Sequence, residues 1–267
     1  MEKRKARALR IAAAAVLLLI LGFSVYKIAD HFLQEKNAKD QFSDLSAQVR
    51  AVENAAPASP DPETSDTVDD PGPRQILPQY ASLHEQNPDL FGWIRIEDTP
   101  VDYPVMYTPQ DPQYYLRRGF DGKRLTSGVP FVDAACPPEG NFYLIYGHHM
   151  KNKTMFGSLP AYKDPAYAER HPLIRFDTLY ESRTYQVMAV FTTRIYGASE
   201  TGVFKYNEYR SLTDPSRFEA YVRGVKELSL YDTGVTAAYG DELITLSTCS
   251  TYYSEDGRFV VVAKRIK

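Results

Sequence analysis

Residues 11–26 form a run of sixteen residues without a charged side chain, directly after a basic N-terminal stretch. That stretch, MEKRKARALR, contains five Lys and Arg residues. At a rise of ~1.5 Å per residue, a helix over this run is slightly shorter than a hydrocarbon core of ~30 Å, but Arg10 and Lys27 can extend their charges toward the interfaces. The run therefore predicts a transmembrane anchor.

A cleaved secretory signal is the alternative for this segment. The apolar run is longer than a usual h-region, however, and GFSVYKIADHF contains no A-x-A cleavage site. Because the basic cluster precedes the run, the positive-inside rule places the N-terminus in the cytoplasm. We expect a cytoplasmic basic segment and a single membrane anchor over 1–29, at the cell membrane, with the rest of the chain extracellular.

The segment after the anchor has the composition of a spacer. Residues 30–50 are polar, with Phe32, Phe42, Leu45 and Val49 at near-helical spacing, which indicates a short juxtamembrane helix or stalk. Residues 51–78 are rich in Pro, Ala, Asp, Glu, Ser and Thr, and such a segment buries too little apolar surface to offset chain ordering. We expect an extracellular stalk and disordered linker over 30–73 and a folded catalytic domain over 74–267.

Short apolar runs rich in Val, Ile, Tyr and Phe divide the folded domain, separated by Pro, Gly and Asp. Helical patterns lie at 75–86, around 166–170 and at 215–228, where Asp214 is the expected N-cap. Most links are too short for crossover helices, so the pattern predicts a mainly β fold, an all-β barrel with peripheral helices. The eight expected strands are 91–96, 101–106, 129–132, 142–147, 173–176, 185–192, 242–248 and 259–266.

Charge argues against nucleic acid as a partner. The formal net charge is -3 and the pI is about 6.0, so the chain has no basic field for phosphate.

The run ELITLSTC ends at Cys249, and the next run, RFVVVAKRI, begins at Arg258. If the two runs pair as neighbours, the thiol and the guanidinium meet at one barrel rim. A thiol at a strand end, beside hydroxyls and a fixed cation, has a lowered pKa and an accessible thiolate. Cys249 is therefore the candidate nucleophile. The alternative, a small buried apolar residue, is disfavoured by Ser247, Thr248 and Ser250.

The chain has only two cysteines, so it is not a disulfide scaffold. Cys136 lies in DAACPPEG, a proline-bound turn with no cation or base nearby in sequence, and we interpret it as incidental. A bridge between Cys136 and Cys249 remains the structural alternative for both.

A thiol nucleophile needs an acid and base, and histidine serves as both near neutral pH. Of five histidines, His31 and His84 precede the barrel and His171 is expected at a helix end. His148 and His149 follow the apolar run NFYLIYG, which places an imidazole at another strand end. We favour His148, directly after Gly147. No second Cys or His lies at zinc-ligand spacing.

Together, YGHHM, TLSTC and GRFVVVAKRI resemble the sortase family, specifically class B. TLSTC is similar to the family's TLxTC strand, GHHM to its histidine loop, and the arginine followed by an apolar strand to its arginine motif. The resemblance covers roughly 74–267, and the helix-bearing insertion between 196 and 241 is similar to the long connection of class B. It implies an eight-stranded sortase-type barrel.

The resemblance also implies a cysteine transpeptidase that cleaves the C-terminal sorting motif of surface proteins after threonine. Cys249 would form a thioacyl intermediate, Arg258 would stabilise the oxyanion, and His148 would act as acid and base. The acyl group would pass to an amine of a peptidoglycan cross-bridge precursor or a pilin, without a metal or organic cofactor. The candidate substrate-binding residues are Ser247, Thr193 and Tyr196.

Two other functions remain open at this point. An L,D-transpeptidase is also an exported, β-rich Cys/His wall enzyme, although its S-x-G-C signature is absent. The chain could also be a non-catalytic surface module whose barrel binds peptide. The sequence identifies neither the sorting motif nor the choice between wall anchoring and pilus assembly.

Overall fold

The computed structural model describes residues 2–55, 74–249 and 257–267. Its contacts divide the chain into two compact units, Met1–Gln41 and Phe42–Lys267. The first unit consists of helix α1 (Glu2–Ala55) up to Gln41, and the last turns of α1 belong to the second unit.

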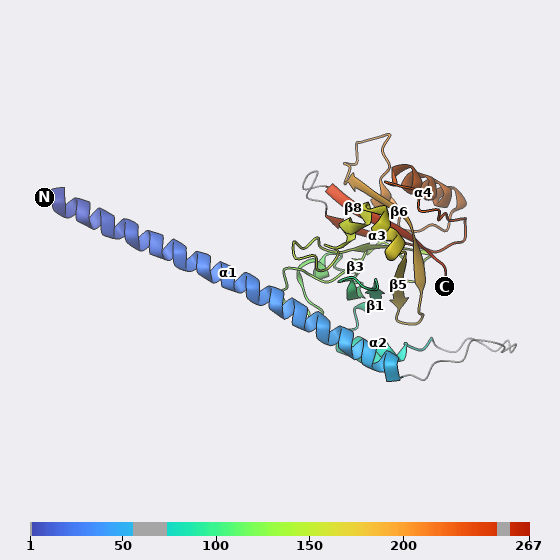
Figure 1. The fold of residues 1–267 in the computed structure, drawn as a ribbon, viewed down its shortest axis with the longest axis horizontal. Helices are drawn as coiled ribbons and strands as arrows, with labels where there is room; N and C mark the ends of the chain where they lie inside the picture. Colours follow the sequence, from blue (N-terminus) through green and yellow to red (C-terminus); the bar gives the residue numbers. More distant parts are fainter. Residues whose placement is uncertain (1, 56–73, 250–256) are drawn as a thin grey trace. The chain divides into compact units, whose positions relative to one another are not determined.

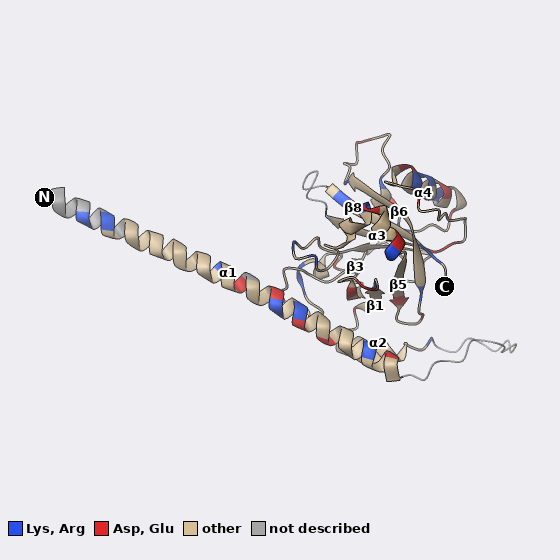
Figure 2. Ribbon diagram, in the orientation of Figure 1, with Lys and Arg blue, Asp and Glu red and all other residues tan. Residues whose placement is uncertain are grey.

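The N-terminal unit is apolar in its middle. Figure 2 shows a stretch of α1 without charged residues, which matches the uncharged run of the sequence. Its large apolar side chains are exposed, as for Leu19 at 74%. By length and composition, α1 is the one helix among the described residues that could cross a membrane.

The second unit is a closed eight-stranded barrel, so the predicted fold class is confirmed. Around the barrel the strand order is β1, β2, β3, β4, β7, β8, β6 and β5, with β5 returning to β1. Figure 1 labels β1, β3, β5, β6 and β8 of this barrel. The strands are β1 (Leu90–Arg95), β2 (Asp102–Met106), β3 (Phe131–Val132), β4 (Phe142–Tyr146), β5 (Leu173–Thr178), β6 (Thr184–Arg194), β7 (Leu243–Cys249) and β8 (Gly257–Arg265). All eight expected strands are present in the predicted chain order.

Two strand pairs are parallel, β2 with β3 and β4 with β7, and the others are antiparallel. The β4 and β7 pair matters most for the site. Because the two strands run in the same direction, their C-terminal ends meet at one rim of the barrel. β8 runs antiparallel to β7, so its N-terminal end reaches the same rim.

Aromatic side chains fill much of the barrel. Phe91, Tyr143 and Phe176 contact one another with ring centroids 5.3 to 6.2 Å apart. Rings of this size bury large apolar areas and favour edge or offset contacts. Tyr143 and Phe176 are buried, so these rings form part of the barrel core.

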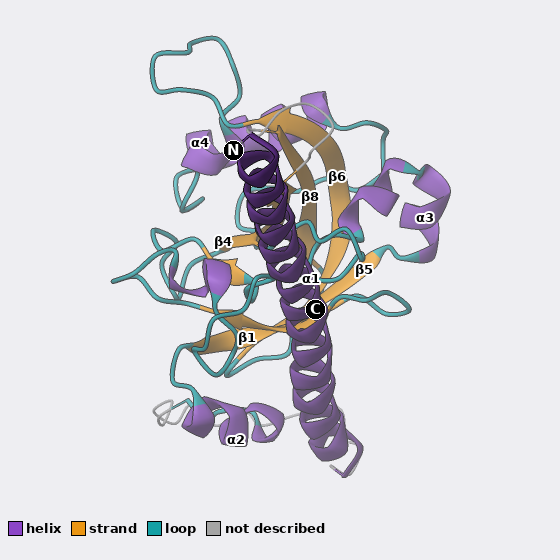
Figure 3. Ribbon diagram, turned by 90° about the vertical axis from the view of Figure 1, so that its left-hand side faces the viewer, coloured by secondary structure: helices purple, strands orange, loops and turns teal. Residues whose placement is uncertain are grey.

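The shorter helices lie outside the strands (Figure 3). Helix α4 (Pro215–Leu228) contacts the barrel through Tyr221. The Tyr221 ring lies 5.1 Å from that of Phe142, and its hydroxyl lies 2.5 Å from the Thr245 hydroxyl. The carboxylate of Asp214 accepts the Arg217 N–H, which confirms the predicted cap. The remaining helical segments are α2 (Pro78–Gln86), η1 (Tyr114–Arg117), η2 (Leu159–Lys163), α3 (Pro165–Arg170) and η3 (Tyr206–Glu208).

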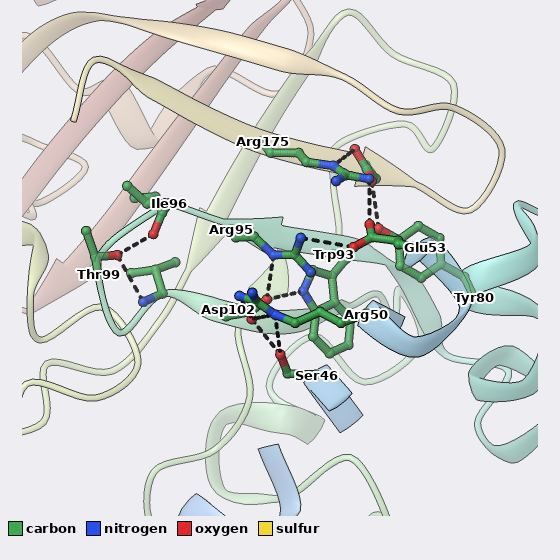
Figure 4. A network of polar contacts seen from close by, with 12 residues as sticks. Ser46, Arg50, Glu53, Tyr80, Trp93, Arg95, Ile96, Thr99, Asp102 and Arg175 are labelled. Carbon is green, nitrogen blue, oxygen red and sulfur yellow. Dashed lines mark hydrogen bonds and ion pairs between the residues drawn. The ribbon is translucent and has the colours of Figure 1, made fainter. Parts of the chain in front are cut away.

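Ion pairs fix the end of α1 to the barrel (Figure 4). The Glu53 carboxylate pairs with Arg95 at 3.1 Å and with Arg175 at 2.8 Å. Arg95 also pairs with Asp102 at 3.0 Å, and the indole N–H of Trp93 donates to that carboxylate at 2.6 Å. These contacts tie α1 to β1, β2 and β5.

Asp102 receives further bonds from α1. Ser46 donates to its carboxylate at 2.5 Å and Arg50 at 2.9 Å. Burial alone would raise the pKa of Asp102, but these bonds, that of Trp93 and the charge of Arg95 outweigh burial, so the pKa lies below its usual value.

The structure differs here from the expected linker. Residues 51–55 continue α1, and the contacts of Glu53 give them a packed place that composition alone does not reveal. The central part of the expected linker, 56–73, lies outside the described residues. The division into anchor, linker and catalytic domain stays a prediction.

Candidate active site

Cys249 and Arg258 are brought together by strand register. β7 ends at Cys249, and the antiparallel register with β8 places Cys249 opposite Arg258. β6 continues the row, because Thr193 is opposite Arg258 on its other side. The three positions therefore lie side by side across three strands at one rim.

His148 reaches the same rim from β4. The parallel register pairs Tyr146 with Ser247, and the next residue, Gly147, donates its N–H to the Ser247 carbonyl at 3.1 Å. Continued by two residues from the pair of Tyr146 and Ser247, this register brings His148 level with Cys249 at the end of β7. A Cβ on Gly147 would lie 2.6 Å from the Phe156 ring, so glycine is required for this close approach.

The His148 ring is partly buried and bound to the backbone. Its Nε2 lies 2.7 Å from the carbonyl oxygen of Leu116 in η1. Burial lowers the pKa of His148, the Leu116 hydrogen bond opposes this, and the charge of Arg117 adds to the lowering. The neutral imidazole is therefore favoured near pH 7.

A cavity of about 600 Å³ opens beside these residues. Its walls are mostly apolar, with few polar groups, as in sites that bind extended or small ligands. Its described lining consists of Pro112, Gln113, Leu116, Val129, Phe131, Asp133, Ala134, Ala135, Tyr146, Gly147, His148, Ile195, Ser247, Thr248 and Arg258.

Ser247, a predicted substrate-binding residue, lines this cavity but is only 1% exposed. Its hydroxyl lies 2.8 Å from that of Tyr206 in η3. Ser247 therefore also connects β7 to the helix-bearing insertion.

The other two predicted binding residues lie beside the cavity. Thr193 is opposite Arg258 in the β6 and β8 register, and the Tyr196 ring lies against the guanidinium of Arg194. Neither is among the described lining residues, whereas Ile195 between them is. Alternation along an extended segment accounts for Tyr196, since adjacent side chains such as those of Ile195 and Tyr196 point to opposite faces, but it does not account for Thr193.

Sequence reasoning missed Asp133, which is a lining residue at the end of β3. Its carboxylate accepts the Tyr146 hydroxyl at 3.1 Å and pairs with Arg210 at 2.8 Å. Arg210 belongs to the insertion, so this ion pair joins the end of β3 to the insertion. The antiparallel pairing of β3 with β4 brings Tyr146 near Asp133, but Arg210 is far away in the chain and no local sequence pattern indicates this contact.

Cys136 is a free, buried cysteine, so the alternative of a bridge to Cys249 is wrong. Burial raises the pKa of its thiol to about 11, which leaves almost no thiolate at neutral pH. Within 2–55, 74–249 and 257–267, no group of three His, Cys, Asp or Glu residues is arranged to hold a metal ion.

The family model and the similar proteins all indicate the same protein family. A model of the Sortase domain matches residues 94–266. Sortase B of Listeria monocytogenes is 30% identical over 257 residues, which cover 93% of this chain and 94% of that protein. Sortase B of Staphylococcus aureus is 26% identical over 268 residues, with 99% of both chains covered.

Solved structures agree. The Staphylococcus aureus sortase B–substrate complex superposes with a TM-score of 0.72 at 25% identity, covering 88% of this chain and 99% of that chain. Sortase B from Bacillus anthracis in complex with AAEK1 gives a TM-score of 0.68 at 27% identity, with the same shares covered.

Proposed function

The chain belongs to the sortase family and is a class B cysteine transpeptidase, and from this premise we propose that it cleaves the C-terminal sorting motif of surface proteins after threonine. The acyl group passes to an amine of a peptidoglycan cross-bridge precursor or of a pilin. The observation that carries the proposal is the register that sets Cys249 opposite Arg258, beside a cavity lined by His148.

The first half of the reaction acylates the enzyme. The thiolate of Cys249 attacks the threonine carbonyl carbon, a C–S bond forms, and the carbonyl electrons move to oxygen. Arg258 stabilises this oxyanion, a contribution of roughly 3 kcal/mol per donor. The oxyanion collapses, the C–N bond breaks, and His148 gives its proton to the leaving amine.

The second half transfers the acyl group. The acceptor amine attacks the thioester carbon and gives a proton to His148. The C–S bond then breaks, which regenerates the thiolate and releases a new amide. Arg258 stabilises the same oxygen in both halves, so one rigid arrangement serves both steps.

Substrate recognition is proposed for the cavity and its rim. Ser247 lines the cavity, and Thr193 and Tyr196 lie next to it at the end of β6. The volume of about 600 Å³ and the apolar walls fit an extended peptide better than a polar sugar chain.

We further propose that the apolar part of α1 is a single-pass membrane anchor, with the barrel on the extracellular side. The exposed apolar side chains of α1 and the preceding basic residues support this orientation. A sorting reaction at the membrane surface would then meet substrates as they are exported.

Capture of the thioester tests the function. The full chain is incubated with labelled peptides of the NPxTx, LPxTG and SPxTG types, and the adduct is located by mass spectrometry. We expect a covalent acyl group on Cys249, released by cross-bridge amines, with Cys249→Ala forming none. Cys136→Ala is the matched control and should stay active.

The same assay separates the alternatives. A non-catalytic binding module would form no adduct, and an L,D-transpeptidase would ignore the sorting peptides. Turnover by Cys249→Ala would remove the proposed nucleophile.

A further inference from the structure

The histidine ring is held by a backbone group whose hydrogen-bonding role is fixed. The Leu116 carbonyl, 2.7 Å from Nε2 of His148, can only accept a hydrogen bond. The hydrogen must therefore reside on Nε2. In a neutral imidazole this leaves Nδ1 as the only nitrogen with a lone pair that can take a proton.

The segment that presents this carbonyl is firmly anchored. Tyr115, next to Leu116 in η1, is 1% exposed, and its hydroxyl donates to Asp89 at 2.9 Å and accepts from Asn87 at 2.7 Å. The backbone is held too, because Val129 donates its N–H to the Tyr115 carbonyl at 3.1 Å. The Leu116 carbonyl thus has little freedom to turn away.

Gly128 packs directly on this segment. It has a φ of +57°, and a Cβ there would lie 2.5 Å from the carbonyl oxygens of both Tyr115 and Leu116. Real Cβ atoms do not approach backbone oxygen so closely, so a side chain would force the Leu116 carbonyl to move. The absence of a side chain at Gly128 is what lets the carbonyl occupy its position.

We infer that the Leu116 carbonyl holds His148 as its Nε2–H tautomer, that Nδ1 is the atom that takes and returns the proton during acyl transfer, and that Gly128 is the positioning residue for this carbonyl. The inference rests on the proposed function for the role of the proton, but the tautomer itself does not depend on it.

The proton inventory follows from this arrangement. Nδ1 accepts the thiol proton, or that of the acceptor amine, and becomes N–H, and the same proton leaves from Nδ1 to the departing amine. The other ring proton stays on Nε2 throughout, where it is donated to the Leu116 carbonyl. Its hydrogen bond strengthens when the ring is charged, which stabilises the imidazolium against the cost of burial.

Nitrogen NMR of the resting enzyme reads the tautomer directly. The full chain is labelled with ¹⁵N-histidine in lipid nanodiscs without substrate, and the His148 signals are assigned by their loss in His148→Gln. Above the titration of the ring, we expect a protonated Nε2 and an unprotonated Nδ1. An Nδ1–H tautomer overturns the inference, whether or not the thioester assay succeeds.

Two glycine variants test the positioning role. Gly128→Ala should give a mixture of tautomers and lower kcat by about 10-fold or more. Loss of a hydrogen bond to a charged group changes a reaction rate by about this factor. Gly122→Ala is the matched control, because its φ of +72° carries similar backbone strain while its Cβ would meet only the Tyr114 hydroxyl, at 3.3 Å. It should keep the tautomer and kcat.

A variant that leaves the backbone unchanged covers the case in which Gly128→Ala does not fold. Tyr115→Phe removes the hydroxyl that anchors η1, and we expect kcat and the tautomer preference to fall together. If either variant folds and loses kcat while His148 keeps a pure Nε2–H spectrum, the link through the carbonyl is wrong. Full activity in both folded variants also overturns the role of Gly128.

Discussion

Arg258 is the direct cross-strand partner of Cys249, one residue into β8 from the end of the strand. Its Nη1 donates to its own neighbour, the Gly257 carbonyl, at 2.8 Å. The pairing of β7 with β8 fixes the backbone position of Arg258 beside Cys249. A planar guanidinium at this position can give two parallel hydrogen bonds to one substrate.

We therefore expect Arg258→Lys to fold and to bind peptide, but to lose ~2 to 4 kcal/mol of transition-state stabilisation. The loss should appear in kcat, because a contact to the developing oxyanion adds little to ground-state binding. Steady-state kinetics with saturating peptide and amine measure this. An unchanged kcat with a raised KM would instead assign Arg258 to substrate positioning.

The two adjacent histidines have different surroundings. His148 lines the cavity, whereas His149 forms an isolated bridge with Met155. We expect His148→Ala to lower acyl transfer by ~100-fold or more and His149→Ala to have a milder effect. Single-turnover transfer rates of the two variants give the order, and the reverse order would move the catalytic role to His149.

Acid should destabilise the barrel through His148. Since burial lowers the pKa of this histidine, the unfolded chain binds its proton more readily than the folded chain. Its contribution to stability is complete above the unfolded pKa of ~6.5 and is lost as pH falls below that value. Urea unfolding at several pH values, followed by Trp93 fluorescence, should show a shallower loss of stability in His148→Gln as the pH falls below ~6.5. Equal slopes would contradict the shift.

The ion pair between Asp133 and Arg210 should control peptide affinity. It joins β3 to the insertion, and Asp133 also orients Tyr146 in the cavity wall. Arg210→Met leaves a partly buried carboxylate unpaired, so we expect KM for peptide to rise ~10-fold with kcat little changed. Arg223→Met, at an exposed position of α4, is the control and should be silent. A fall in kcat alone would show that the wall acts on chemistry rather than binding.

The end of α1 should contribute to barrel stability. Glu53→Ala removes the partner of Arg95, whose side chain is 7% exposed, and of the more exposed Arg175. We expect a loss of about 2 kcal/mol, below the usual cost of a fully buried pair because solvent screens part of it. Asp44→Ala, exposed on the same helix, should change the free energy of unfolding by less than ~0.5 kcal/mol. Equal effects of the two changes would mean that this contact is not a stabilising one.

The strands could be predicted from sequence because each is a short β-branched and aromatic run bounded by turn residues, whereas their order around the barrel was not predicted. The pairing of Cys249 with Arg258 was also within reach, since the two runs are consecutive and antiparallel neighbours are common. The helical end of α1 could not be predicted from sequence, because it is stabilised by contacts with Arg95, Asp102 and Arg175, which lie far along the chain.

In the candidate active site, too, some residues could be predicted from the sequence and others could not. His148 follows from its place at the end of an apolar run, but its Leu116 partner belongs to a short 3₁₀ segment with no apolar period. The lining residue Ile195 was missed in favour of Tyr196 because a shift of one position reverses the face of an extended chain. Loop contacts of this kind depend on tertiary packing and leave no local pattern.

The parallel pairing of β4 with β7 also determines when the thiol site comes into being during folding. Phe142 pairs with Leu243, so the strand that leads to His148 must wait for a partner from much later in the chain. Pairs so distant in sequence form slowly, because the intervening loop must be closed first. β1 and β2 can pair early from neighbouring residues, but the reactive centre exists only after the last two strands have joined.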